Sequence, residues 1–167
     1  AIYEGVTLDV NHRAAVLLAK KAKESGAKSF VYASSCSVYG FVDSGARTEQ
    51  AQLNPLTAYA KSKVLAEQDL SHLADDSFTV TCLRFATACG MSKRLRLDLV
   101  LNDFVASALA YGTITILSDG TPRRPLIHIV DVARAIDWGI RRESSEGGDF
   151  LVINIGSDEL NYQLKDL

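Results

Sequence analysis

The sequence lacks a large charge of one sign and lacks any long apolar run. Its 18 lysines and arginines nearly balance 20 aspartates and glutamates, so the formal net charge is only −2. A chain this close to neutral has no electrostatic attraction for nucleic acid or for an anionic membrane surface. No stretch approaches the roughly 20 apolar residues that span a bilayer, and no charged-then-apolar leader suggests secretion. We therefore expect neither nucleic acid nor a membrane among the partners.

Cysteine is also scarce. Cys36, Cys82 and Cys89 are odd in number, form no C-x-x-C pair and have no histidine at the spacing of a metal site. Free thiols in a reducing compartment explain them better than a disulfide or a zinc site. We expect a cytoplasmic protein that binds no metal.

The 167 residues are 47% hydrophobic, which is enough for one globular domain with a buried core. Apolar side chains recur at helical spacing over residues 7–25 and predict a helix whose apolar face packs on that core. The positions of this face are Val10, Ala14, Leu17, Leu18 and Ala22. Lys20 is expected to point outward, and Gly26 is expected to end the helix.

Short apolar runs alternate with further helical patterns along the chain. We predict strands at residues 29–34, 78–85, 113–117 and 150–155, and helices at residues 57–73, 97–111 and 131–142. Thr57 is the expected N-cap of the first of these helices. Buried strands that alternate with helices indicate an α/β fold with a parallel sheet.

Tyr59 and Lys63 are four residues apart in the predicted helix 57–73, so they share one of its faces. An ammonium close to a phenol favours the phenolate, which allows a tyrosine to accept a proton near neutral pH. A serine hydroxyl from residues 34–40 can pass a proton between that phenol and a substrate alcohol. With a nicotinamide beside them, these groups fit hydride transfer at a hydroxyl-bearing carbon. The pair alone also occurs by chance, as a surface tyrosine and lysine.

Four motifs follow one another along the chain. They are S-S-x-x-V-Y-G at residues 34–40, N-P-x-T-x-Y-x-x-x-K at 54–63, R-x-x-T-x-x-G at 84–90 and D-G-x-x-x-R-x-x-x-H-x-x-D-x-A-x-A at 119–135. In this order and spacing they resemble an extended short-chain dehydrogenase/reductase of the NAD-dependent epimerase/dehydratase type, a group that reworks nucleotide sugars. The resemblance runs from Asn11 to about Asp158.

The resemblance implies a partial Rossmann-like parallel sheet with flanking helices, plus part of a small substrate lobe. It assigns about residues 1–90 and 125–157 to the C-terminal half of an NAD(P)-binding domain. About residues 91–124 would be a substrate-lobe insertion within that single domain. The strands near residues 30, 80 and 152 are expected to be neighbours at one side of the sheet.

The resemblance also implies roles for single residues. Ser35 would be the catalytic hydroxyl, Tyr59 the base, and Lys63 the cation that favours the phenolate and bonds the nicotinamide ribose. Ser34 and Asn11 would contact the cofactor as well. The alternative for Ser35 is a strand-end serine that bonds the local backbone, and we expect its hydroxyl to lie near the Tyr59 phenol.

Thr87, Asn102 and Arg124 would bind the substrate. Arg124 matches the position that holds the nucleotide diphosphate, a task that suits the planar, bidentate guanidinium. Its alternative is a surface arginine beside Arg123. Arg84 is expected to end its strand in a structural, hydrogen-bonding role.

The eleven glycines include no G-x-x-G-x-x-G or G-x-G-x-x-G turn. In the family this turn holds the cofactor pyrophosphate at a helix N-terminus. We therefore expect a fragment or a truncated product, lacking that turn and the C-terminal end, that binds NAD or NADP weakly or not at all. The exposed edge of the strand at residues 29–34 favours a homo-oligomer.

The expected activity of the intact enzyme is epimerisation of a nucleotide sugar, by NAD(P)-dependent oxidation and re-reduction at a hydroxyl carbon. The dehydratase branch of the family needs an acidic pair directly after the catalytic hydroxyl, but Cys36 and Ser37 follow Ser35. An epimerase or a reductase is therefore favoured. Two alternatives remain, a truncated non-catalytic binding or assembly module and an extended reductase acting on a non-sugar ketone, which has no need of Arg124.

Overall fold

The computed structural model describes residues 3–41 and 45–167, so part of the predicted loop at residues 40–54 lies outside the described residues. The chain forms two compact units. Unit 1 comprises the residues up to Arg84 together with residues 135–154, and unit 2 comprises residues 85–134 and 155–167.

Unit 1 is built on a three-stranded parallel sheet. Its strands are β1 (Ser29–Ser35), β2 (Thr79–Phe85) and β5 (Phe150–Ile155), in the order β1-β2-β5. The predicted neighbourhood of the strands near residues 30, 80 and 152 is thereby confirmed. Residues 80–84 of β2 are all buried, as the central strand of a sheet covered on both faces should be. β1 is an edge strand of this sheet.

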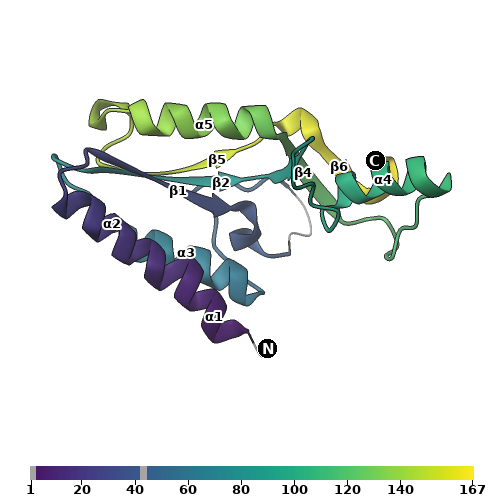
Figure 1. Cartoon of the computed structure of the whole chain (residues 1–167), viewed down its shortest axis with the longest axis horizontal. Coiled ribbons are helices and arrows are strands. Elements are labelled where there is room, and N and C mark those ends of the chain that lie inside the picture. Colours follow the sequence, from purple (N-terminus) through teal and green to yellow (C-terminus); the bar gives the residue numbers. More distant parts are fainter. Residues whose placement is uncertain (1–2, 42–44) are drawn as a thin grey trace. The chain divides into compact units, whose positions relative to one another are not determined.

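Helices cover both faces of the unit 1 sheet (Figure 1). One face carries α1 (Glu4–Leu8), a π-helical turn (Asp9–Arg13), α2 (Ala14–Glu24) and α3 (Ala58–Ser71). The other carries residues 135–141 of α5 (Ile129–Arg141), and 3-10 turns follow β1 (Cys36–Tyr39) and α5 (Ser144–Glu146). The predicted N-cap is confirmed, because the Thr57 hydroxyl accepts a hydrogen bond from the Ala60 amide at 3.1 Å.

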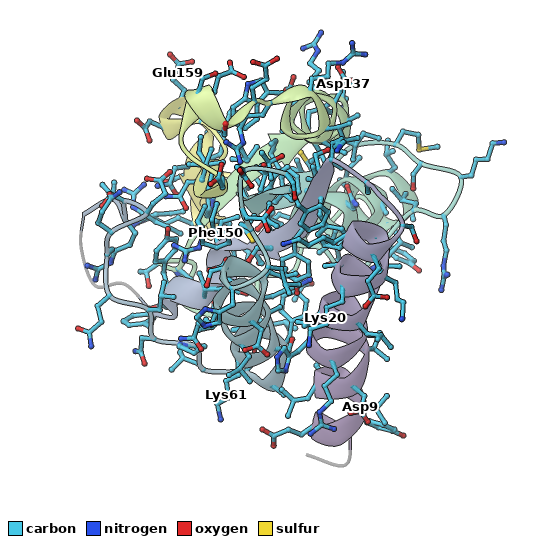
Figure 2. All side chains as sticks on the ribbon, turned by 90° about the vertical axis from the view of Figure 1, so that its left-hand side faces the viewer. Asp9, Lys20, Lys61, Asp137, Phe150 and Glu159 are labelled. Atoms are coloured by element: carbon cyan, nitrogen blue, oxygen red, sulfur yellow. The ribbon has the colours of Figure 1, made fainter. Side chains whose placement is uncertain are left out.

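The buried face of α2 differs from the prediction. Val16 and Ala19 are buried, whereas Leu17 and Leu18, expected in the core, are exposed, and so is Val10 in the π-helical turn. The small side chains of α2 allow the helix backbone to approach the sheet and α3 closely, so its alanine-rich face packs there and the bulkier leucines point outward. Lys20 lies on the exposed side, as expected (Figure 2).

The core of unit 1 lies between the sheet and the α2–α3 layer. Its buried members are Val16, Ala19, Tyr32, Ala66, Leu70, Phe78, Val80 and Cys82. Leu70 and Phe78 are completely buried, and burial of such a side chain contributes about 1.5–3 kcal/mol. This core holds α3, and with it Tyr59 and Lys63, on the sheet.

Unit 2 contains a second small sheet of order β3-β4-β6. β3 (Thr87–Cys89) pairs in parallel with β4 (Arg123–His128), and β4 pairs antiparallel with β6 (Asn161–Gln163). The unit also holds α4 (Val100–Tyr111) and 3-10 turns at Asp158–Leu160 and Leu164–Asp166. α4 ends at Gly112, whose φ of 68° is left-handed.

The strand predicted at residues 113–117 is wrong. These residues are not in a strand, and Leu117 is 97% exposed. A strand exists through the hydrogen bonds it makes with a neighbour, and no described residue pairs with this segment. The β-branched residues therefore favour an extended backbone here, but no neighbouring strand among the described residues pairs with it.

Three further findings concern the predicted absences. No helix within residues 3–41 and 45–167 is long and apolar enough to cross a membrane. The same residues contain no cluster of three or more side chains arranged to hold a metal ion. Cys36, Cys82 and Cys89 form no disulfide with one another.

Candidate functional site

Ser35 is the last residue of β1, and the 3-10 turn Cys36–Tyr39 follows it. Its hydroxyl accepts a hydrogen bond from the Ser37 amide at 3.2 Å, the local backbone bond that was the alternative reading of this residue. Within the described part of the chain, the Ser37 hydroxyl is the one buried side-chain oxygen or nitrogen without a hydrogen-bond partner. A buried hydroxyl without a partner is costly, so this end of β1 suits a ligand with a polar group.

Gly40 brings the S-S-x-x-V-Y-G motif close to the segment that leads into α3. Its φ is 69°, and a Cβ atom there would lie 2.1 Å from the Asn54 carbonyl oxygen. The Asn54 amide also donates to the Val38 carbonyl at 3.0 Å. The glycine is therefore required by both its backbone conformation and its surroundings, and it joins the two motifs.

Tyr59 and Lys63 lie on the first turns of α3. The Lys63 ammonium is 5.3 Å from the centroid of the Tyr59 ring and donates to the Ala33 carbonyl at 2.8 Å. Lys63 is only 8% exposed, whereas Tyr59 is 44% exposed. A nearly buried cation thus lies close to the ring of a tyrosine that is itself accessible, and a cation near a phenol favours the phenolate.

A second tyrosine lies against Lys63. The Tyr32 ring centroid is 4.7 Å from the Lys63 ammonium, and the Tyr32 hydroxyl donates to the Asn11 carbonyl in the π-helical turn at 2.8 Å. Burial raises the pKa of Tyr32 far above its ordinary value, so this phenol stays protonated. Burial lowers the pKa of Lys63, and the Glu67 carboxylate opposes that change.

Glu67 is the centre of a buried polar network behind the end of β1. Its Oε1 accepts from the Ser34 hydroxyl at 2.5 Å and from Arg84 Nε at 3.0 Å, and its Oε2 accepts from an Arg84 Nη at 2.6 Å. All three residues are buried. The Ser34 hydroxyl therefore points to Glu67, and a direct contact with a cofactor would have to break this bond.

Arg84 extends the network to the 3-10 turn. Its guanidinium donates to the Tyr39 hydroxyl at 2.9 Å, and that hydroxyl donates to Asn154 Oδ1 at 2.6 Å. The backbone N–H of Asn154 donates to Glu49 Oε1 at 2.7 Å. The structural, hydrogen-bonding role expected for Arg84 is thereby confirmed, and the paired carboxylate raises its pKa further, although burial opposes this.

The predicted substrate residues all belong to unit 2. Thr87 opens β3, and Arg124 lies on β4, where it pairs with Tyr162 of β6. Asn102 lies on α4, and its side-chain amide donates to the Arg96 carbonyl at 3.0 Å, a bond that holds the preceding loop. Arg124 is exposed, and its side chain donates to the Arg123 carbonyl at 2.9 Å.

Arg124 lines a cavity of about 440 Å³ within unit 2. Its apolar walls include Phe104 of α4, and Asp98 and Asp103 are acidic members of its lining. The other lining residues are Leu97, Val100, Thr115, Ile116, Leu117, Ser118, Pro122 and Leu164. Asn102 is not among them. A guanidinium in a partly apolar cavity suits a ligand that carries both an anionic group and a flat apolar part.

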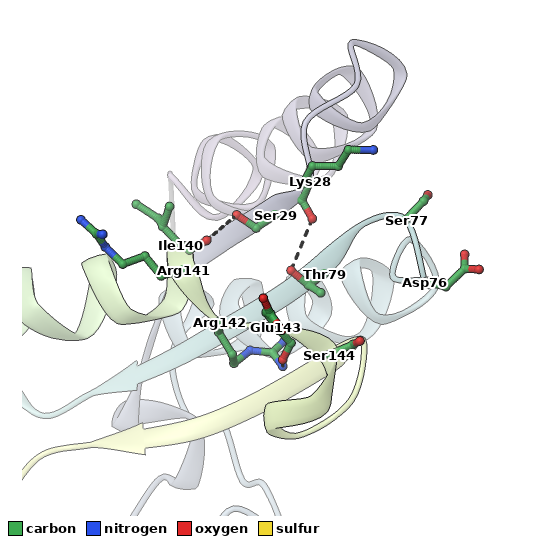
Figure 3. Close-up of a pocket in the computed structure, with 10 residues that line it drawn as sticks. All are labelled: Lys28, Ser29, Asp76, Ser77, Thr79, Ile140, Arg141, Arg142, Glu143 and Ser144. Carbon is green, nitrogen blue, oxygen red and sulfur yellow. Dashed lines mark hydrogen bonds between the residues drawn. The ribbon is translucent and has the colours of Figure 1, made fainter.

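A second cavity, of about 420 Å³, lies in unit 1 at the starts of β1 and β2 (Figure 3). Its polar groups bond one another: the Ser29 hydroxyl donates to the Ile140 carbonyl at 3.0 Å, and the Thr79 hydroxyl lies 3.4 Å from the Lys28 carbonyl. Arg142 is buried there and donates to the Thr81 hydroxyl and to backbone carbonyls. These bonds join α5 to the sheet, at the end of the strands opposite to Ser35.

The sequence analysis did not identify Glu67 or Tyr32 as part of the site. Glu67 had an available signal, because it follows Lys63 by four residues and so shares its helical face. Tyr32 had none, since a tyrosine in a buried strand is ordinarily a core residue. The expected closeness of the Ser35 hydroxyl and the Tyr59 phenol stays a prediction.

Known proteins similar to this chain belong to the family that its sequence motifs resemble. The family model described as "NAD dependent epimerase/dehydratase family" matches residues 2–156. A protein of Bacillus subtilis (strain 168), described as the uncharacterized UDP-glucose epimerase YtcB, is 31% identical over 157 residues, which are 93% of this chain and 48% of that protein.

Solved structures are similar over nearly the whole chain. MoeE5 in complex with UDP-glucose and NAD is 29% identical with a TM-score of 0.82, over 95% of this chain and 52% of MoeE5. A UDP-glucuronic acid 4-epimerase from Bacillus cereus in complex with NAD is 27% identical with a TM-score of 0.78, over 93% of this chain and 49% of that enzyme. The chain thus spans about half the length of these relatives.

Proposed function

Because the chain belongs to the NAD-dependent epimerase/dehydratase family, we propose that it provides the catalytic residues for NAD(P)-dependent epimerisation of a nucleotide sugar. The observation that carries this proposal is the buried Lys63 ammonium 5.3 Å from the ring of the accessible Tyr59, beside the strand end with Ser35. Relatives with UDP-glucose or UDP-glucuronic acid and NAD in their descriptions support the choice of substrate and cofactor.

Tyr59 acts as the base in this proposal. It takes the proton of a sugar hydroxyl as that carbon is oxidised and returns it when the ketone is reduced. Lys63 stabilises the phenolate form of Tyr59, and Ser35 passes the proton between the phenol and the sugar oxygen. When bound, the oxidised nicotinamide of NAD or NADP would accept the hydride, and its reduced form would return it.

Tyr59 and Lys63 are the first candidates to hold the nicotinamide end of the cofactor. The unpartnered buried hydroxyl of Ser37 fits a polar ligand at the same strand end. Ser34 and Asn11 lie close to these residues. Ser34 follows Ala33, whose carbonyl accepts a hydrogen bond from Lys63, and the Asn11 carbonyl accepts one from the Tyr32 hydroxyl. We include both residues in the proposed cofactor site because of this proximity.

Arg124 is proposed to bind the diphosphate of the nucleotide sugar, and Thr87 and Asn102 to contribute elsewhere in the substrate lobe. Arg124 forms no ion pair with any described residue, and it lines the 440 Å³ cavity of unit 2. A guanidinium without an ion-pair partner suits a phosphate ligand. This assignment also favours a nucleotide sugar over the non-sugar ketone of an extended reductase.

An epimerase is favoured over a dehydratase at the level of residues. Cys36 and Ser37 follow Ser35, so no carboxylate stands next to the candidate hydroxyl to assist loss of water.

Two further proposals concern the whole protein. The absence of a disulfide among Cys36, Cys82 and Cys89 fits a reducing compartment such as the cytoplasm. A homo-oligomer fits the exposed apolar side chains Val10, Leu17 and Leu18 on the outer side of the helices that cover the sheet.

The direct test is Tyr59→Phe in the intact enzyme, assayed with NAD and UDP-glucose or UDP-glucuronic acid, with the epimer detected by NMR. Loss of the proton-transferring oxygen should lower turnover by about a hundredfold or more, with substrate binding nearly unchanged. The matched control is Tyr111→Phe, which changes a tyrosine that is 79% exposed on α4. Full turnover by the Tyr59 variant would show that another group is the base.

A further inference from the structure

Glu67 and Lys63 are one helical turn apart on α3, and they bond consecutive residues of β1. The Lys63 ammonium donates a hydrogen bond to the Ala33 carbonyl at 2.8 Å, and the Ser34 hydroxyl donates one to the Glu67 carboxylate at 2.5 Å. The next residue along the strand is Ser35. One helix thus holds, with two side chains, the strand end from which the candidate catalytic hydroxyl projects.

Resting on the proposed function, we propose that Glu67 is a positioning residue: it fixes the end of β1 that carries Ser35 relative to the helix that carries Tyr59 and Lys63. Glu67 is itself held from β2 by the two bonds of Arg84, at 3.0 and 2.6 Å. Because Glu67 and Arg84 are buried, their geometry is set by the fold, before any ligand binds.

The carboxylate of Glu67 also affects the charge of Lys63. Burial lowers the pKa of Lys63, and Glu67 is the group that raises it. The elements packed against α3 carry the other titratable side chains, which are Glu4, Asp9, His12, Arg13, Lys20, Lys21, Lys23, Glu24, Tyr32, Cys36 and Tyr39. His12 bonds Asp69 at 2.6 Å and Tyr39 bonds Arg84, whereas Tyr32 contacts Lys63 through its ring. Glu67 therefore helps to keep the ammonium protonated, the state that favours a phenolate at Tyr59.

A buried ion pair is also a structural element, so the test has to separate the two roles. Glu67→Gln alone leaves the Arg84 guanidinium buried without a counter-charge and can unfold the protein. The double variant Glu67→Gln/Arg84→Met removes both charges at similar volume. Arg142→Met is the matched control, because Arg142 is the other buried arginine of unit 1 and bonds Thr81 and backbone carbonyls instead.

The first readout is independent of activity. In protein labelled with ¹³C-lysine, the Cε signal of Lys63, assigned by its loss in Lys63→Met, is titrated with pH. The pKa of Lys63 should fall in the single variant and, by less, in the double variant, because Glu67 attracts the ammonium and Arg84 repels it. Arg142→Met should lower the melting temperature and leave that titration unchanged. An unchanged Lys63 titration in the folded double variant would overturn the proposal.

The second readout uses Ser34→Ala, which removes one hydroxyl and no charge. If Glu67 positions the strand end, kcat of the intact enzyme should fall about tenfold with KM unchanged, while the Lys63 titration stays as in the wild type. An unchanged kcat would refute the positioning role even if neither Glu67 variant folds. If Lys63 responds to Glu67 but Tyr59→Phe keeps full turnover, the proposed function fails and the link between Glu67 and Lys63 stands.

Discussion

Single residues determine whether the end of β1 can support catalysis, and Lys63 is the most sensitive of them. Its ammonium is nearly buried against two tyrosine rings and has one recorded hydrogen bond, to the Ala33 carbonyl. A cation in this position affects the phenol electrostatically over a short distance with little water between them. Lys63 should therefore be visible in the pH dependence of the reaction as well as in its rate.

Lys63→Met is expected to shift the rise of the pH–rate profile to higher pH. Without the ammonium the phenolate is less favoured, so the base forms only at a higher pH. The measurement is kcat/KM of the intact enzyme between pH 6 and 10.

The control for that profile is Lys61→Met, which removes an exposed lysine from the same helix (Figure 2). Its profile should superimpose on that of the wild type. Equal displacement by both variants would mean that general surface charge, rather than the Lys63 contact, sets the profile.

Gly40→Ala is expected to destabilise unit 1. The residue has a φ of 69° and a ψ of −146°, a region that is essentially restricted to glycine, and a Cβ would lie 2.1 Å from the Asn54 carbonyl oxygen. Backbone strain of this kind costs about 1–3 kcal/mol, and the steric overlap adds to it. Urea unfolding measures the loss.

Gly26→Ala provides the comparison, because Gly26 also has a positive φ, 83°, but open space around its Cβ position. It should lose clearly less stability than the Gly40 variant. Equal losses would show that the close approach to Asn54 carries no energetic cost.

At the scale of elements, local sequence signals predicted the helices and strands of unit 1 well. The Thr57 cap and the three sheet strands appear where the turn formers and apolar runs indicated. Predictions failed where a non-local partner decides the outcome. The α2 helix offered two apolar faces, and residues 113–117 had a strand preference without a strand beside them.

The candidate site shows the same division. Tyr59 and Lys63 were predictable, since both belong to one helix and their spacing alone gives a shared face. The Glu67–Arg84 pair joins α3 to β2 and depends on how the two elements pack. No local periodicity encodes such a pair, although an acidic residue on the face of Lys63 is a signal that can be sought.

The Lys23–Asp75 ion pair should make the packing of α2 dependent on pH. The Asp75 carboxylate accepts hydrogen bonds from Lys23 and, with a smaller effect, from Ser77. These bonds lower its pKa from the ordinary 3.8 to about 2. A depressed carboxyl pKa contributes stability above the ordinary value, and that contribution is lost as the pH falls toward 2. Asp75→Asn should therefore lower the melting temperature at pH 7 and have little effect near pH 2.

Thermal unfolding at pH 7, 5, 3 and 2 measures this difference. The neighbouring Asp76, which is exposed, serves as the control through Asp76→Asn. An equal effect of Asp75→Asn at pH 7 and pH 2 would contradict the assignment of the stability to the ionised pair.

At the scale of the whole molecule, the central question is how firmly these 167 residues bind the cofactor by themselves. They contain the residues proposed for the nicotinamide end but no glycine-rich turn for the pyrophosphate. Most polar contacts to a dinucleotide come from that turn. We therefore expect NADH to bind this polypeptide with a dissociation constant of about 1 mM or weaker, which corresponds to about 4 kcal/mol or less.

The same polypeptide should self-associate. β1 is an edge strand of its sheet, and the α1–α2 layer exposes Val10, Leu17 and Leu18; unpaired strand edges and apolar patches both favour association. Calorimetric titration with NADH, together with the mass in solution by light scattering, tests both expectations on one sample. Micromolar binding by a monomer would refute them together, because it would require a pyrophosphate site built from residues other than a glycine-rich turn and a β1 edge that is protected within the single chain.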